Sequence, residues 1–221
     1  MISATDVSDA EFYPAVADVY IPPGVMGREA MSFDVRAFVV RRGDDIALVD
    51  TLMQPEHCEL ILDALARAAS TFTDIRYVIL THHHPDHTGG LAEVARRAPQ
   101  AQILCGTADA DAVRASTGVS VKAIGPADRP LGFEVIPTPG HTSGHLCLFD
   151  QASSTMLLGD VAGNVGVLER APARFTENLA QAEATLRALA ERDFEIAFPS
   201  HGDPLVEGAA ESLRRLVDGS A

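Results

Sequence analysis

The chain has 221 residues, which fits one globular domain spanning residues 1–221, and 47% of the residues are hydrophobic. Its 31 acidic and 17 basic residues leave a formal net charge of −14, and its aromatic residues are nine phenylalanines and three tyrosines. Because so acidic a surface repels phosphate backbones and offers few rings for base stacking, we expect no nucleic-acid partner.

The sequence also lacks the signals of a secreted or membrane protein. No stretch reaches 18 uninterrupted apolar residues, and the first dozen residues carry three acids and no apolar run. Cys58, Cys105 and Cys147 are an odd number of cysteines, more than 40 positions apart, which fits neither a disulfide framework nor a thiolate zinc cluster. We expect a cytoplasmic protein with buried thiols and no membrane partner.

Hydrophobic patterning predicts alternating strands and helices. Extended or β-branched stretches predict strands at 34–41, 45–52, 76–80, 101–105, 120–124, 133–137, 145–149, 155–158 and 195–198. Amphipathic runs predict helices at 55–69, 87–97, 108–116, 176–192 and 208–217. A glycine and acid cluster at 41–45 predicts a hairpin turn between the first two strands.

This order favours an α/β fold in four layers. Hairpins in the first third and between 133 and 158 argue against a simple alternation, so we expect two mixed β-sheets packed face to face, with helices on both outer faces. A single doubly wound sheet is the alternative, but the glycine-rich phosphate loop typical of that fold does not follow the first strand.

A histidine-rich segment, residues 81–90, directly follows the apolar strand at 76–80. Residues two apart on an extended backbone point to the same side, so His82 and His84 can converge on one metal ion, while His83 should point away. Asp86 and His87 follow within three residues. Imidazole and carboxylate donors without thiolate suit zinc, iron, manganese or cobalt.

Three later segments have the same form, because each predicted strand end delivers a histidine or an aspartate into a glycine-containing turn. These segments are 137–145 with His141, 158–160 with Asp160, and 199–204 with His201. Each of them is weak evidence when taken singly.

Together, these motifs resemble those of the metallo-β-lactamase superfamily over nearly the whole chain. The signature His-x-His-x-Asp-His stands at 82–87, an early strand ends at Asp50, and a His, an Asp and a His follow in order at His141, Asp160 and His201. The resemblance implies an αβ/βα sandwich of two similar halves, with metals at one edge between the two sheets.

The resemblance also implies roles for these residues. The first metal would be held by His82, His84 and His141, the second by Asp86, His87 and His201, with Asp160 bridging the two. Asp50 would fix the orientation of the histidine loop by hydrogen bonding, and His145 would be structural. We expect two divalent ions, zinc first, with iron or manganese as alternatives.

Two such ions imply hydrolysis of a small molecule by a shared hydroxide, with Asp86 as the catalytic residue that orients it and moves its proton. A bridging Asp160 resembles the glyoxalase II-like hydrolases, thioesterases and lactonases more than β-lactamases, so we expect an ester, thioester or lactone substrate. The chain ends 20 residues after His201, without the basic helical domain of hydroxyacylglutathione hydrolases, and Val161 to Asn164 lack the tyrosine of homoserine lactonases.

Alternatives from other classes stay open. One is a mononuclear iron enzyme resembling the persulfide dioxygenases, another is a β-lactam hydrolase, and a third is a non-catalytic member with structural metals. Loops at 21–31, 53–57 and 163–175 should line the pocket. Arg170 and Arg174 are either anion-binding or surface residues. Val165, Val167 and Leu168 either form an acyl-binding wall or pack on the neighbouring helix.

Overall fold

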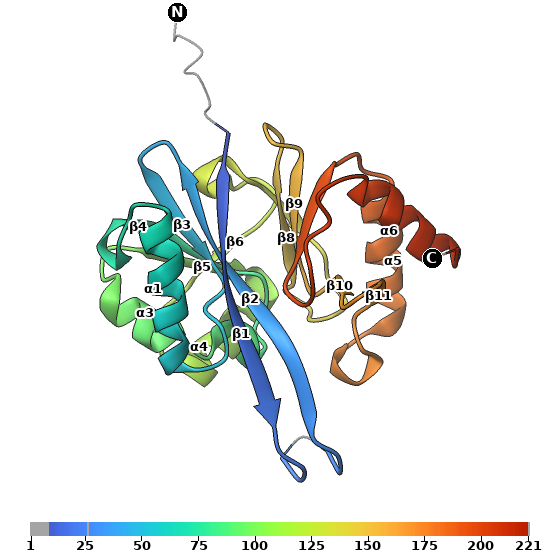
Figure 1. Cartoon of the computed structure of the whole chain (residues 1–221), viewed down its shortest axis with the longest axis horizontal. Helices are drawn as coiled ribbons and strands as arrows, with labels where there is room; N and C mark the ends of the chain where they lie inside the picture. The colour runs from blue at the N-terminus through green and yellow to red at the C-terminus, as the bar shows by residue number, and fades with distance from the viewer. Residues whose placement is uncertain (1–8, 26, 221) are drawn as a thin grey trace, which may run out of the picture.

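Two β-sheets pack face to face and helices cover both outer faces, as the computed structural model in Figure 1 shows. The structure describes residues 9–25 and 27–220. Residues 1–8, which carry part of the prediction about a signal peptide, lie outside the described residues. The predicted α/β four-layer sandwich of two mixed sheets is therefore confirmed.

The larger sheet has six strands that are neighbours in chain order. They are β1 (Glu11–Ile21), β2 (Met31–Arg42), β3 (Asp45–Val49), β4 (Ile75–Leu80), β5 (Gln102–Gly106) and β6 (Lys122–Ile124). The first three strands are antiparallel, whereas β3 to β6 run parallel. Parallel neighbours end at the same edge of the sheet, so the segments after β3, β4 and β5 meet there.

The smaller sheet has the order β12 (Ile196–Pro199), β9 (Thr155–Gly159), β8 (Leu146–Asp150), β7 (Glu134–Pro137). The pair β12 and β9 is parallel, and the other pairs are antiparallel. A separate two-stranded ribbon joins β10 (Ala162–Asn164) and β11 (Leu168–Arg170).

Three apolar layers hold these elements together. Phe38 and Val49 of the larger sheet pack with Phe133 and Leu148 in the core between the sheets. The outer face of the larger sheet packs on α1 (Cys58–Arg67), α3 (Leu91–Arg97) and α4 (Ala110–Thr117), and that of the smaller sheet on α5 (Leu179–Ala190) and α6 (Ala209–Asp218). Figure 1 shows the two helical groups on opposite sides of the molecule.

The predicted helix at 87–97 is interrupted. A short helix, α2 (Pro85–Thr88), ends before Gly89 and Gly90, and α3 begins afterwards. A Cβ atom on Gly89 would lie 1.9 Å from the Met53 carbonyl oxygen, and one on Gly90 would lie 2.2 Å from that of Thr51. These glycines therefore let the histidine segment approach the chain that follows β3.

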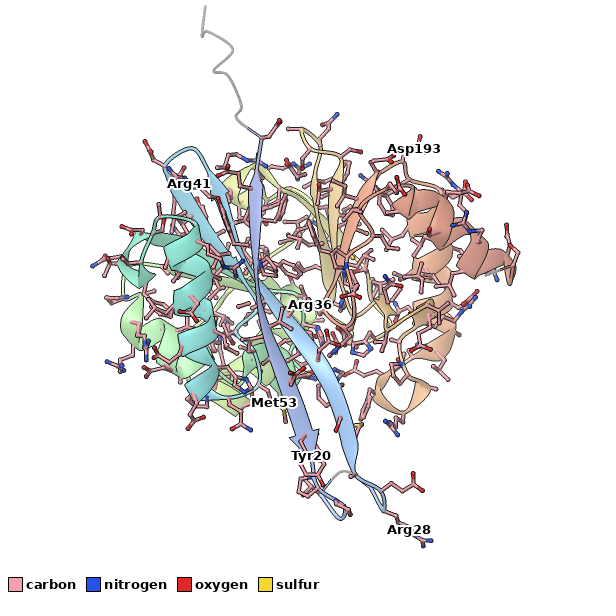
Figure 2. The ribbon with its side chains drawn as sticks, in the orientation of Figure 1. Tyr20, Arg28, Arg36, Arg41, Met53 and Asp193 are labelled. Atoms are coloured by element: carbon pink, nitrogen blue, oxygen red, sulfur yellow. The ribbon has the colours of Figure 1, made fainter. Side chains whose placement is uncertain are left out.

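The strand β1 was not predicted, and its pairing with β2 makes one predicted pocket loop part of a hairpin. Pro14 lies within β1, which is possible because β1 is an edge strand. The strands β1 and β2 pair over their full length, and their hairpin extends beyond the body of the molecule, with Tyr20 and Arg28 near its tip in Figure 2. Most of the predicted pocket loop at 21–31 is this tip.

Within the described residues, no helix has both the length and the hydropathy needed to span a bilayer.

Candidate metal centre

Five chain segments meet at one edge of the two sheets and bring the predicted ligands together. They follow β3, β4, β7, β9 and β12, and they carry Asp50, the 82–87 signature, His141, Asp160 and His201. Three groups of side chains place metal-ligating atoms within 4.8 Å of one another: His82, His84 and His141; His82, His87 and Asp160; and Asp86, His87 and His201. All seven predicted ligands belong to these groups.

The first group consists of three imidazoles whose nitrogen atoms face one another. His84 Nδ1 lies 3.1 Å from His82 Nε2 and 2.9 Å from His141 Nε2. His82 and His141 are buried. Burial lowers the pKa of His141 to about 4 and holds the pKa of His82 well below its usual range. Both rings are therefore neutral at pH 7, the form in which a histidine nitrogen binds a metal.

The group of Asp86, His87 and His201 lies on the other side of Asp160. Asp86 Oδ2 lies 3.6 Å from His87 Nε2 and 3.5 Å from His201 Nε2. His201 Nδ1 faces the main-chain oxygen of Asp34 at 2.6 Å, so that bond turns Nε2 toward the centre. The rings of Phe33 and His201 pack in a T-shaped arrangement, with their centroids 5.5 Å apart.

Asp160 contacts the His82, His84 and His141 group and also the Asp86, His87 and His201 group. Its Oδ2 lies 3.3 Å from both His141 Nε2 and His201 Nε2, and its Oδ1 lies 3.4 Å from His87 Nε2. Burial opposes ionisation of this carboxyl, but His87 and His201 outweigh burial and hold its pKa well below the usual range. An ionised carboxylate between two nitrogen clusters has the position expected of a bridging ligand.

Two atoms of this centre support a metal-binding role directly. His87 Nε2 and Asp160 Oδ1 are buried and have no hydrogen-bond partner. Buried polar atoms are nearly always paired, and an unpaired one needs an explanation such as a bound ion. Both atoms face the centre, and nitrogen and carboxylate donors without thiolate are the ligands of a hydrolytic zinc site. The residues present thus fit a pair of divalent ions.

Asp50 has the orienting contacts that were predicted for it. Its Oδ1 accepts a hydrogen bond from the Thr81 main-chain NH, and its Oδ2 accepts one from the Thr81 hydroxyl and faces His87 Nδ1, each at 2.8 Å. These bonds leave His87 Nε2 free to face the centre. The backbone of Asp50 has a φ of 62°, a strained value for a residue other than glycine.

Sequence reasoning missed Asp109, which is buried in η3 (Thr107–Asp109) directly after β5. Its Oδ2 accepts hydrogen bonds from the main-chain NH of His83 at 3.0 Å and the Thr142 hydroxyl at 2.7 Å, and its Oδ1 accepts one from the Gly144 NH at 2.7 Å. One carboxylate therefore ties the loop of His82 and His84 to the loop of His141. Its only sequence signal is its place after a predicted strand.

Three histidines have no predicted metal role, His57, His83 and His145, and the last two have definite contacts beside the centre. His83 Nδ1 lies 3.1 Å from Asp109 Oδ2 and His83 is half-buried, in agreement with a supporting role outside the coordination. His145 is buried, accepts a hydrogen bond from the Asp160 main-chain NH at 3.0 Å, and lies 2.7 Å from the Thr138 hydroxyl. These contacts fit the structural role predicted for His145, and the bond from the Asp160 NH joins its ring to the backbone of Asp160.

A pocket of about 240 Å³ borders the centre at His141 and Asp160. Of the three loops predicted to line a pocket, only 163–175 contributes to this one, through Arg170, Ala171 and Ala173. The predicted acyl-binding wall was wrong for this pocket, because Val165 and Val167 are exposed in the turn between β10 and β11 and Leu168 packs into the core under α5 and α6.

The two arginines of that loop differ in their contacts. Arg170 forms an ion pair with Glu183 at 2.8 Å. Arg174 lies against the Met31 sulfur, at the end of the β1–β2 hairpin nearest its tip, and over the Phe175 ring.

Comparison with known proteins places this geometry in a family. The model of the metallo-β-lactamase superfamily matches residues 32–201. The chain belongs to the metallo-β-lactamase superfamily. Solved structures agree in fold: FIM-1, a metallo-β-lactamase of Pseudomonas aeruginosa in a mono-zinc form, superposes with a TM-score of 0.71 at 17% identity over 97% of each chain. AidC, a dizinc quorum-quenching lactonase, superposes at 0.66 and 18% identity, covering 89% of this chain and 88% of AidC.

Among curated relatives of this superfamily member, an atrochrysone carboxyl ACP thioesterase of Pseudocercospora fijiensis is 28% identical over 184 residues. The match covers 80% of this chain and 51% of the thioesterase, so the chain spans about half the length of that relative. The glyoxalase II-like branch and the individual ligand assignments stay predictions.

Proposed function

We propose that this protein is a metal-dependent hydrolase that cleaves an ester, thioester or lactone bond of a small molecule. The observation that carries the proposal is Asp160, whose carboxylate lies between two clusters of metal-ligating atoms and has a buried, unpaired Oδ1. We assign His82, His84 and His141 to one divalent ion and Asp86, His87 and His201 to the other, with zinc as the first expectation.

Two divalent ions held by these residues would lower the pKa of a bound water and would polarise the carbonyl of a substrate. Residues of the protein would supply proton transfer and hold the ligand loops. Asp86, with its Oδ2 between His87 and His201, is the residue we assign to accept and pass on the proton of the attacking water. Asp50, Asp109 and His145 hold the ligand loops in place.

The substrate class is supported by the bridging position of Asp160 and by the names of two proteins that this chain resembles, a thioesterase and a lactonase. The similarity to a β-lactamase structure is a similarity of fold at 17% identity. A β-lactam is therefore the competing substrate in the test rather than the expected one.

The test is hydrolysis by zinc-loaded protein of an aryl ester, an acyl thioester, a γ-lactone and a cephalosporin. We expect turnover of at least one of the first three. The variant Asp160→Asn, similar in shape, should lose more activity than the roughly 10- to 100-fold typical of an outer-shell partner, together with bound zinc. Asp193→Asn is the control, because the Asp193 side chain is 96% exposed and forms its ion pair with Arg214 of α6, not with a residue of the metal centre.

Three results would contradict the proposal. They are hydrolysis of the cephalosporin alone, full activity with normal zinc content in Asp160→Asn, and a single iron per chain with oxygen uptake on glutathione persulfide. The last of these would establish the dioxygenase alternative.

A further inference from the structure

The pocket beside the metal centre is lined by segments that follow strands β7 and β9 of the smaller sheet and by helix α5. His141 and Asp160 form its border with the centre, and helix α5 forms the opposite wall through Leu179, Ala182 and Leu186. Because two of the seven assigned ligands border the pocket, a substrate carbonyl at the metals has the pocket directly beside it.

Apart from Asp160 at the metal centre, the charged groups of the pocket wall, Arg170 and Glu183, are already paired. Arg170 Nε donates a hydrogen bond to Glu183 Oε2 at 2.8 Å, and Arg187 donates a second bond to Glu183 Oε1 at 2.7 Å. The charge of Arg170 is thus compensated within the wall. A carboxylate or phosphate of a substrate would have to displace Glu183 to reach Arg170, so the wall does not select an anionic group.

The hydroxyl groups of the wall are also engaged. Thr185 donates a hydrogen bond to the Pro139 main-chain oxygen at 2.6 Å, and Thr176 donates one to that of Pro172 at 3.1 Å. Thr138 pairs with His145. Because the protons of these hydroxyls are engaged inside the protein, an acceptor group of a ligand, such as a carbonyl or carboxylate oxygen, gains no new hydrogen bond from them. Such an oxygen would lose its water without compensation.

The rest of the wall is aliphatic, and it consists of Val161, Ala171, Ala173, Leu179, Ala182 and Leu186. Each methylene group that leaves water for such a surface strengthens binding by about fourfold. The volume of about 240 Å³ is below the roughly 300–1,000 Å³ of sites for drug-sized ligands, so the pocket fits one short hydrocarbon group rather than a carrier, a sugar or a peptide.

We infer that this pocket holds the acyl chain of the substrate, and that the substrate is an ester or thioester of a short, uncharged aliphatic acid. The inference rests on the proposed function and names its substrate class. The acyl side enters the pocket because it is the side that can be short and apolar, whereas a bulky alcohol or thiol leaving group needs a path to solvent.

Ala182 is the residue that we expect to set the chain length. It is half-buried on the inner face of α5, and the main chain of Gly140 lies against it, so a larger side chain there takes up pocket space. Ala184 offers a matched control, because it is exposed on the same helix and does not line the pocket.

The test measures binding of acetate, butyrate, hexanoate and octanoate to zinc-loaded protein by calorimetry. These ions carry the acyl chain of the product and require no turnover. In the wild type, affinity should rise by about fourfold per added methylene and then level off when the pocket is full. In Ala182→Leu, hexanoate should bind at least tenfold more weakly while acetate binds as before, and Ala184→Leu should match the wild type.

Because Ala182 also lies against Gly140, Leu179→Ala is a second variant that removes wall surface without adding bulk. Leu179 is 55% exposed at the start of α5, so its truncation leaves the core intact. It should weaken hexanoate binding several-fold and leave acetate binding unchanged. Affinity that does not depend on chain length, or equal effects of Ala182→Leu and Ala184→Leu, would overturn the inference.

Hydrolysis of thioesters of the same acids separates this inference from the proposed function. Turnover without any preference for chain length would contradict the acyl pocket and support the proposed hydrolase. Chain-length-dependent binding without turnover of any ester, thioester or lactone would remove the hydrolase and leave a binding pocket for short aliphatic carboxylates.

Discussion

At the scale of single residues, the ligands are held by side chains that do not themselves face the centre. Asp50 fixes His87 and Thr81, His145 fixes the backbone of Asp160, and Asp109 ties two ligand loops together. Such partners orient ligands, so their loss is expected to act on metal affinity as well as on stability.

Asp109 provides the sharpest residue-level prediction. In Asp109→Asn, an NH₂ group replaces one carboxylate oxygen. This NH₂ must face at least one of the groups that now donate to Asp109, which are the NH groups of His83 and Gly144 and the Thr142 hydroxyl. We expect a loss on the order of 1–3 kcal/mol in the free energy of unfolding of the metal-free protein. We also expect a loss of zinc affinity within the roughly 10- to 100-fold range of outer-shell partners, measured by chelator competition.

The pH dependence of that loss has a defined sign. The hydrogen bond with Asp109 raises the pKa of His83 from its usual 6.5, so this contribution is complete below 6.5 and disappears as the pH rises through the folded-state pKa. Burial opposes ionisation of Asp109, but the bonds from His83 and Thr142 outweigh it and lower the pKa from 3.8, so its contribution disappears in acid. The gap between wild type and Asp109→Asn should be widest between about pH 4 and 6.5; a gap that widens above pH 8 would contradict this account.

The cysteines give a second residue-level prediction. Burial raises the pKa of Cys58 and of Cys105 to about 11 and that of Cys147 to about 12. Because the thiolate is the reactive form, none of the three should react with Ellman's reagent in folded protein at pH 8, and all three should react after denaturation. Rapid labelling of one thiol in the native state would show that its surroundings are more open than described here.

At the scale of elements, the loop between β7 and β8 depends on its approach to α5. Gly140 has a φ of 137°, and a Cβ atom there would lie 2.3 Å from the Ala182 main-chain nitrogen, so Gly140 lets the loop place the next residue, His141, against the helix.

Gly140→Ala should therefore destabilise the protein by about 2 kcal/mol or more, since strain and a backbone clash combine. It should also lower zinc binding, because His141 must move with the loop. Gly125→Ala is the matched control, as a Cβ atom there meets nothing within 4 Å. Urea unfolding and zinc stoichiometry measure both effects; equal stability of the two variants would contradict the argument.

At the scale of the whole molecule, the metal centre lies where segments from both sheets meet, so bound ions should stabilise the entire fold. One ion at a thousandfold excess over its Kd adds about 4 kcal/mol. A domain of this size gains roughly 2–4 °C in Tm per kcal/mol, so removal of zinc with a chelator should lower Tm by at least about 8 °C. Zinc should restore Tm in the wild type but only partly in Asp160→Asn. An unchanged Tm after complete metal removal would mean that the sheets hold the centre without the ions.

Much of this protein follows from its sequence alone. The signature at 82–87 after an apolar strand, and the ordered His141, Asp160 and His201 at later strand ends, predicted which residues would meet, because parallel strand ends share one sheet edge. Periodicity predicted the strands and helices of both halves. It missed β1, where Pro14 interrupts a pattern that an edge strand tolerates, and the three-residue strands β10 and β11, which are too short to show a period.

Tertiary structure alone decided what surrounds the ligands. Asp109 links two loops because η3 packs against them. Arg170 is not free to bind an anion because α5 places Glu183 beside it. The pocket wall came from α5 rather than from the valines at 165 and 167. Ligand motifs are local in sequence and carry their own chemistry, whereas hydrogen-bond partners and pocket walls depend on contacts between distant segments, which local patterns do not encode.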